Sequence, residues 1–226
     1  MSEVKETALT QVERPVDQVL PTVQGSTMWN NKDMFELTQR LAGMLAKSEL
    51  VPQAYRDKVQ DCVIIVDIAQ RANISPLYAM QNITVVKGKP SWSGQACMTL
   101  INSCGKFKDS RYVYTGTKGT DTCGCYVEAV RASDGEIVQG TEVTMQMAKS
   151  EGWISNPKWR NMPEQMLGYR AAAFFARMHC PEALSGMQTR EEVYDVDAAS
   201  KANFSAVKQG LKERVAKAGK VGENNG

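Results

Sequence analysis

The stretch Lys149–Cys180 constrains the fold most, because it joins a tryptophan-containing loop to a segment with helical periodicity. Trp153 and Trp159 come first, and Pro163 then suits the first turn of a helix, where its missing N–H costs no hydrogen bond. Beyond Pro163, apolar residues recur on one arc at 100° per residue: Leu167, Ala171, Phe174, Phe175 and Met178. The stretch therefore predicts a loop followed by a long amphipathic helix.

Two arginines lie beside that apolar arc. Arg170 and Arg177 are seven residues apart, so they share a second stripe, and Ala173 between them keeps the stripe shallow. The two side chains are roughly 10 Å apart along the helix axis, about the reach of two neighbouring phosphates in a stretched strand. Arginine binds phosphate through two parallel hydrogen bonds, so the pattern favours a polyanion site. The alternative is an ordinary core helix with two solvated arginines.

Composition limits where such a site can be. The 226 residues are 42% hydrophobic and 23% charged, which is typical of a soluble globular protein. The net charge is only +2, so nucleic-acid affinity must come from a localised basic surface. No apolar run approaches the ~20 residues that span a bilayer, and the N-terminus lacks a signal-peptide pattern. We therefore expect a cytoplasmic, reducing location, with the six cysteines as buried free thiols.

The first half of the chain reads as helices followed by a short hairpin. Residues 1–28 are polar and lack a sustained period, which predicts a disordered arm. Capping residues and apolar spacing then predict the following elements: a helix after the Asn30-Asn31 cap, a helix from near Pro52 to Asn73, a short helix from Pro76 to Met80, a hairpin over 83–92 and a helix capped by Ser93 and closed by Gly105.

Three strand-like runs precede the tryptophan loop, at 107–116, 122–131 and 136–145, with turn sequences between them. The pattern predicts an α+β fold in which a three-stranded antiparallel meander is followed by a long helix that covers it, a β-β-β-α core. N-terminal helices and the short hairpin precede this core, and both termini are expected to be flexible.

Past Pro181 the chain reads as less core-like. Residues 189–197 are acidic, and 198–220 predict a basic amphipathic helix with Phe204, Val207 and Leu211 as its apolar side. We therefore divide the chain into a disordered arm (1–28), a core (29–197), and a basic C-terminal helix with a flexible tail (198–226).

Several kinds of catalytic site have no counterpart in the sequence. It contains no GxxxxGK[ST] motif for cradling nucleotide phosphates. The only histidine, His179, argues against a Ser–His or Cys–His nucleophile pair. Cys123-Gly-Cys125 is too tight and too isolated for a zinc site. We therefore expect a protein that is not an enzyme and has no cofactor, metal site or catalytic residue.

Basic and aromatic residues recur instead through the middle of the chain. Basic grooves bind phosphate in a salt-sensitive way, and aromatic faces stack on bases without reading their sequence. Single lysines can equally be solvated surface residues, and tryptophans can equally be core. The candidate DNA-binding residues are Lys87, Lys89, Trp92, Lys106, Lys108, Arg111, Lys118, Lys149, Lys158, Trp159, Arg160, Tyr169, Arg170 and Arg177.

Three stretches, Val85–Gln95, Thr144–Trp153 and Lys158–Glu182, resemble the RecT/Red-beta family of phage single-strand annealing proteins. The resemblance covers roughly residues 30 to 197 and is strongest from Trp159 to Arg177. It implies ATP-independent binding of single-stranded DNA, annealing of complementary strands in homologous recombination, and assembly into rings or helical filaments, in the cytoplasm of a bacterial host. Arg170 and Arg177 match basic positions of the family pattern, so the resemblance assigns DNA binding to them first.

The expected partners follow from the same resemblance. A homo-oligomer would use the helical regions 34–50 and 55–73 for contacts between subunits. The basic C-terminal helix would dock a host single-strand-binding protein or a phage exonuclease. Two alternatives remain: a nucleic-acid-binding oligomer or scaffold without annealing activity, and a nucleic-acid-processing enzyme with an unrecognised metal site, for which no carboxylate cluster is evident.

Overall fold

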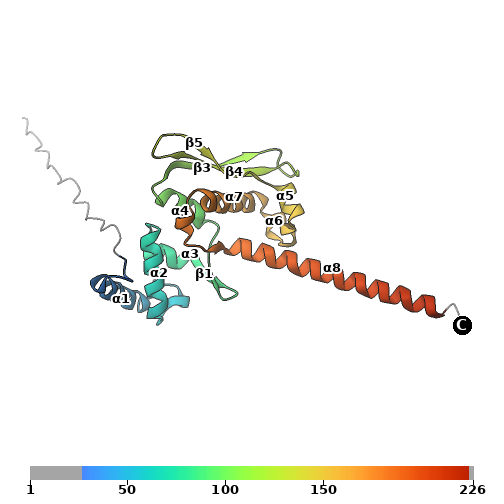
Figure 1. Ribbon diagram of the computed structural model, residues 1–226, viewed down its shortest axis with the longest axis horizontal. Coiled ribbons are helices and arrows are strands. Elements are labelled where there is room, and N and C mark those ends of the chain that lie inside the picture. The colour runs from blue at the N-terminus through green and yellow to red at the C-terminus, as the bar shows by residue number, and fades with distance from the viewer. Residues whose placement is uncertain (1–26, 224–226) are drawn as a thin grey trace, which may run out of the picture.

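A computed structural model describes residues 27–223, with a four-stranded sheet on one side, helices behind it and a long C-terminal helix leaving the body (Figure 1). The expected disordered arm, 1–28, lies outside the described residues except for Thr27 and Met28, and Met28 is buried. The elements in chain order are α1 (Lys32–Ala46), η1 (Gln53–Tyr55), α2 (Val59–Arg71), α3 (Pro76–Asn82), β1 (Ile83–Val86), β2 (Lys89–Trp92), α4 (Ala96–Ser103), β3 (Phe107–Thr115), β4 (Gly124–Arg131), β5 (Ile137–Gln139), β6 (Val143–Thr144), α5 (Met145–Ser150), η2 (Trp153–Ser155), α6 (Lys158–Asn161), α7 (Pro163–His179), η3 (Pro181–Leu184), β7 (Gln188–Thr189) and α8 (Arg190–Glu223).

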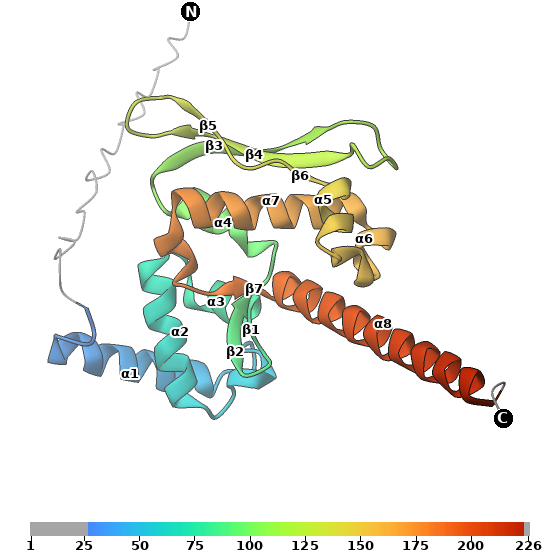
Figure 2. The same ribbon diagram turned by 45° about the vertical axis from the view of Figure 1, so that its right-hand side comes forward.

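The larger sheet pairs β3, β4 and β5 antiparallel in chain order, and β6 also pairs with β4. Helices α7 and α4 lie against one face of this sheet (Figure 2), so the predicted α+β class is confirmed. The third strand is shorter than the predicted run of 136–145. It is interrupted after Gln139, and Met145 already begins α5. Thr144 ends the strand because its side chain accepts the Met147 N–H at 3.1 Å and so caps α5.

The long helix begins at Pro163 as predicted, but it is buried on more sides than one apolar arc. Ala171, Ala172, Ala173 and Ala176 are fully buried, which lets α7 pack closely against both the sheet and α4 beside it. The arc predicted from spacing is only partly right. Met178 is 65% exposed and Phe174 is only partly buried. The reason is that α7 contacts elements all around it, so small residues and not the arc decide its packing.

The N-terminal helices start mostly where capping residues predict. Asn31 accepts the Met34 N–H at 3.1 Å, and Ser75 accepts the Tyr78 N–H at 3.1 Å. The helix predicted from Pro52 is wrong in its first part, because η1 is followed by Asp57 in the left-handed region, at φ 59°, and α2 begins only at Val59.

The hairpin β1–β2 is antiparallel, with Lys87 and Gly88 both at positive φ as a two-residue turn requires. The predicted Ser93 cap is wrong, since α4 begins at Ala96. The Ser93 hydroxyl instead bonds Oδ1 of Asn82 at 2.6 Å, and both residues are buried.

The expectation that the chain becomes less core-like past Pro181 is wrong. Leu184 is buried, β7 pairs parallel with β2, and α8 begins at Arg190. The acidic residues at the start of α8 are buried as well, and α8 runs without a break across the expected boundary at 197/198. On the predicted apolar side of this helix, Phe204 and Val207 are exposed, and the Leu211 side chain lies outside the described residues.

All six cysteines are free, five of them buried and Cys104 partly exposed. Within residues 27–223, no helix combines the length and the apolar character that crossing a bilayer would require.

Candidate nucleic-acid interface

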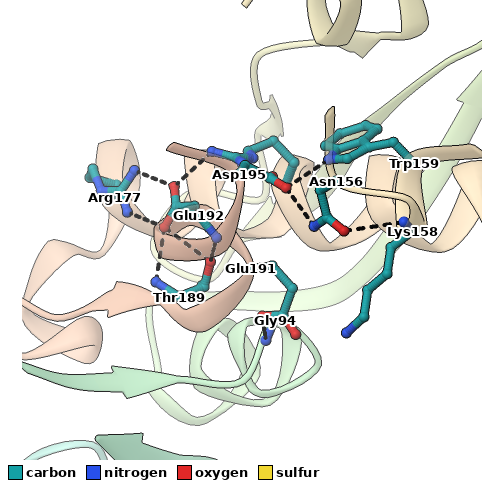
Figure 3. Close-up of polar contacts among 10 residues, drawn as sticks. Gly94, Asn156, Lys158, Trp159, Arg177, Thr189, Glu191, Glu192 and Asp195 are labelled. Atoms are coloured by element: carbon teal, nitrogen blue, oxygen red, sulfur yellow. Dashed lines mark hydrogen bonds and ion pairs between the residues drawn. The ribbon is translucent and has the colours of Figure 1, made fainter. Parts of the chain in front are cut away.

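The two arginines of α7 face carboxylates at the start of α8, and together these four residues form an arginine–carboxylate cluster: Arg170, Arg177, Glu192 and Asp195. Arg177 donates from Nη1 and Nη2 to the two oxygens of Glu192, each at 2.9 Å (Figure 3). Arg170 is only 6% exposed and is ion-paired with both Asp195 and Glu192. The cluster therefore fastens the first turns of α8 to α7.

The same cluster holds the tryptophan loop. Asp195 is fully buried and accepts hydrogen bonds from Asn156 Nδ2 at 2.8 Å and Trp159 Nε1 at 3.0 Å, besides that from Arg170. The Arg170 guanidinium lies 4.0 Å from the centroid of the Trp153 ring, a cation–π distance. Loop, α7 and α8 are thus joined through one buried carboxylate.

At Glu192 and Asp195, burial and hydrogen bonding shift the carboxyl pKa in opposite directions. Burial raises the pKa of Glu192, but hydrogen bonds from Arg177 and from the Thr189 N–H outweigh it and hold that pKa below its usual 4.5. Burial raises the pKa of Asp195, against the lowering effect of its three hydrogen-bond donors. Both guanidinium groups are therefore bound to carboxylates of the protein itself, Arg170 in the interior and Arg177 at the surface.

Three of the predicted DNA-binding residues are consequently interior. Arg170 is buried in the cluster, Trp159 is fully buried above Asp195, and Trp92 is fully buried with its Nε1 donating to the Leu184 carbonyl at 3.2 Å. Sequence reasoning missed Glu192 and Asp195, which it placed in an acidic peripheral stretch. The available signal was their spacing of three residues, which places both carboxylates on one face of a helix.

Six further predicted residues are exposed but ion-paired. The pairs are Lys87 with Asp197, Lys106 with Glu182, Arg111 with Glu128, Lys118 with Glu164, Lys149 with Asp121 and Arg177 with Glu192. Exposed pairs are weak in water, so apart from Arg177, whose partner is buried, these cations can exchange their carboxylates for phosphates.

The remaining candidates differ in their surroundings. Lys89, Lys108, Lys158 and Arg160 are exposed and form no ion pair with any described residue. Tyr169 is half-buried, its hydroxyl accepts from Gln165 Nε2 at 2.6 Å, and its ring packs on Gly94, where an added Cβ would lie 2.8 Å from it.

The structure brings part of this set together around the short helix α6. Lys158 lines a hollow of about 310 Å³ with Tyr194, Asp197 and Lys201. Arg160 lines a second hollow of about 330 Å³ with Asp121, Lys149 and Glu164. Lys87 forms an ion pair with Asp197, which lines the first hollow, and Lys118 forms an ion pair with Glu164, which lines the second. We call the six cations the α6 band: Lys87, Lys118, Lys149, Lys158, Arg160 and Lys201.

Two members of this surface were missed by sequence reasoning. Lys201 forms an ion pair with Asp197 at 3.0 Å, and Tyr194 is 46% exposed beside Lys158. Both lie on α8, which was treated as peripheral. An exposed aromatic ring among cations is the combination that holds an extended nucleic-acid strand by its phosphates and bases.

Lys106 lies elsewhere, lining a hollow with Arg131 and His179 at the far end of α7. Lys108 and Arg111 are on β3 and line none of these hollows. Among residues 27–223, no group of three or more histidine, cysteine, aspartate or glutamate side chains is arranged to hold a metal ion.

Comparison with known proteins finds no match: no protein-family model, no curated protein and no solved structure is similar to this chain.

Proposed function

We propose that this chain binds single-stranded DNA along the α6 band and anneals complementary strands without ATP, as its resemblance to the RecT/Red-beta annealing proteins implies. The observation that supports the proposal is the band itself. Cations from the β1–β2 turn, the β3–β4 turn, α5, α6 and α8 converge on one short helix. Lys158 and Arg160 form no ion pair with a described carboxylate, and Tyr194 is exposed beside Lys158.

Such a surface acts physically and not by covalent chemistry. Lysine and arginine displace counterions from the phosphates, which makes binding sensitive to salt. A strand held by its phosphates keeps its base edges free to pair with an incoming strand. Several copies on one strand convert modest affinity at each copy into tight binding overall.

In this proposal the arginine–carboxylate cluster positions the interface and does not bind phosphate. Asp195 accepts hydrogen bonds from Asn156, in the loop before α6, and from Trp159, on α6 itself. Its ion pair with Arg170 holds it in place. Arg170 is therefore a positioning residue, and its substitution acts first on the folded structure.

The test is annealing of two complementary fluorescent oligonucleotides without ATP. We expect the wild type to accelerate annealing and Lys158→Ala/Arg160→Ala to lose most of that acceleration. The matched control is Lys108→Ala/Arg111→Ala, which removes one lysine and one arginine from exposed positions on β3, outside the α6 band. The control should anneal as the wild type does.

Two other results would distinguish the alternatives. Salt-dependent DNA binding without acceleration would favour a nucleic-acid-binding oligomer or scaffold that does not anneal. Equal loss in both double variants would show that general charge, and not the α6 band, carries the activity.

A further inference from the structure

One carboxylate lies among the cations of the α6 band and is shared by two of them. Asp197, on α8, forms ion pairs with Lys87 of the β1–β2 turn and, at 3.0 Å, with Lys201. Its side chain is 21% exposed and lines the first hollow together with Lys158 and Tyr194. Hydrogen bonds from Lys87 and Lys201 lower the pKa of Asp197 below its usual 3.8, so the group is charged at neutral pH.

The two oxygens of this carboxylate have separate partners. Lys87 Nζ donates to Oδ1 of Asp197, and Lys201 Nζ is paired with Oδ2. A phosphate of the DNA backbone likewise presents two charged oxygens, and lysine binds such oxygens as a compact point charge. The Asp197 carboxylate therefore lies where a phosphate could bridge the same two lysines.

The two hollows of the α6 band differ in how their acids are used. In the second hollow, Asp121 and Glu164 are each paired with a lysine of their own. In the first hollow, Asp197 is the only acid among the described lining residues, and three lysines of the α6 band lie in or beside it. One carboxylate thus decides how much positive charge the first hollow offers to a ligand.

An aromatic ring lies one helical turn from this carboxylate. Tyr194 is 46% exposed and precedes Asp197 by three residues on α8, so the two side chains share a face of the helix. They are about 4.5 Å apart along the helix axis. A base stacked on the ring would bring the phosphate of its own nucleotide to the two lysines.

We propose that Asp197 occupies the position of one phosphate of the bound strand and limits the affinity of the α6 band by competing for Lys87 and Lys201. This inference rests on the proposed function and deepens it. A strand that binds displaces the carboxylate from the two lysines, which lowers the affinity of each copy for DNA. Since exposed ion pairs are weak, the exchange is readily reversed. A strand held in this way can be released and realigned while it pairs with its complement.

The first experiment measures binding of a labelled oligothymidylate to the full chain by fluorescence anisotropy. Asp197→Asn removes the charge and keeps the size of the side chain. We expect it to bind about fivefold more tightly than the wild type at low salt, with a smaller difference as salt rises. The control is Asp134→Asn, the same change at an exposed aspartate of the β4–β5 turn that pairs with Arg131 outside the α6 band. It should bind as the wild type does, and urea titration checks that each variant keeps its fold.

The second experiment repeats the substitution in Lys87→Ala/Lys201→Ala. Without the two lysines there is nothing for the carboxylate to compete for, so Asp197→Asn should then change the affinity by less than about twofold. A gain as large as in the wild-type background would mean that Asp197 repels the strand as any nearby acid would. That result would overturn the proposal.

The remaining outcomes separate this inference from the proposed function. Binding by the wild type that Asp197→Asn does not tighten, or that Asp134→Asn tightens equally, would overturn this inference and leave the annealing proposal intact. Tighter binding by Asp197→Asn, with no acceleration of annealing by the wild type, would overturn annealing alone. Absence of binding by every protein at every salt concentration would overturn both.

Discussion

Arginines lie on two neighbouring helices of this protein, α6 and α7, and the two helices use them in opposite ways. On α7, Arg170 is 6% exposed and is paired with acids of α8. On α6, Arg160 is exposed and forms no ion pair with a described residue. The residue type is the same on both helices. What separates a structural arginine from a candidate phosphate ligand is a carboxylate 25 residues later in the chain.

The free-energy cost of binding a phosphate also differs between the two helices. A phosphate reaching Arg170 would have to displace Asp195 and leave a buried carboxylate uncompensated, which costs several kcal/mol. A phosphate reaching Lys158 or Arg160 displaces only water and mobile ions. The α7 pair should therefore govern stability and the α6 band should govern affinity for DNA.

The largest expected effect is on stability. Asp195→Ala removes the acceptor shared by Asn156, Trp159 and Arg170. It should lower the free energy of unfolding by about 3–5 kcal/mol, because Arg170 stays buried with a single, more distant carboxylate. Urea titration followed by tryptophan fluorescence measures this change. Asp197→Ala, at a partly exposed acid of the same helix, should change the midpoint much less. Equal effects would mean that the cluster is not the stabilising contact.

The second effect is a dependence of stability on pH. The folded-state pKa of Glu192 lies below 4.5, so its pairing with Arg177 stabilises the fold fully above pH 4.5. That contribution is lost as the pH falls through the lowered pKa. Glu192→Gln should cost about 1.5–3 kcal/mol at neutral pH and flatten this part of the profile. Urea midpoints of both proteins between pH 3 and 7 test it, and parallel profiles would contradict the assignment.

The third effect is on the salt dependence of single-stranded DNA binding. Lys158→Ala/Arg160→Ala removes two proposed phosphate contacts, so the slope of log affinity against log salt for a single strand should decrease by about 1.4. Arg177→Ala should leave the slope unchanged, since its guanidinium is held by Glu192. Fluorescence anisotropy with a labelled oligonucleotide across a salt series gives both values. A reduced slope in Arg177→Ala would restore α7 as part of the interface.

The smallest expected effect comes from removing the exposed ring of Tyr194. Tyr194→Ala should weaken single-strand binding about fivefold, the equivalent of ~1 kcal/mol from one stacked base, while Tyr194→Phe retains affinity. The salt slope should not change in either variant. Weakening by Tyr194→Phe as well would assign the effect to the hydroxyl instead of stacking.

Features with a local cause could be predicted from the sequence. Asn31 and Ser75 cap helices with their own side chains, Pro163 starts α7, and Lys87-Gly88 turns the hairpin. The α+β arrangement also follows from the order of strands and helix. Each of these depends on residues within a few positions of one another, and such information is present in any short window of sequence.

Features that depend on distant partners could not be predicted. The parallel pairing of β7 with β2 joins Trp92 to Thr189, and nothing within either strand indicates the other. The prediction of the candidate site was partly wrong for the same reason. Arg170 was assigned to DNA because Asp195 was not recognised as its partner, whereas Lys201 and Tyr194 were missed because α8 was placed outside the core.

The late position of these partners has a consequence for synthesis. Trp92 donates to Leu184, the Gly94 N–H donates to Glu191 at 2.7 Å, and β2 gains its second neighbour only at Gln188. Synthesis proceeds N-terminus first at about 5–20 residues per second, so a nascent chain that carries residues 27–180 waits roughly a second or more before its interior polar groups are satisfied. Until then Arg170 lacks Asp195 and Glu192. Contacts made by three separate segments of the core therefore form together, only after residues 184–195 have been synthesised.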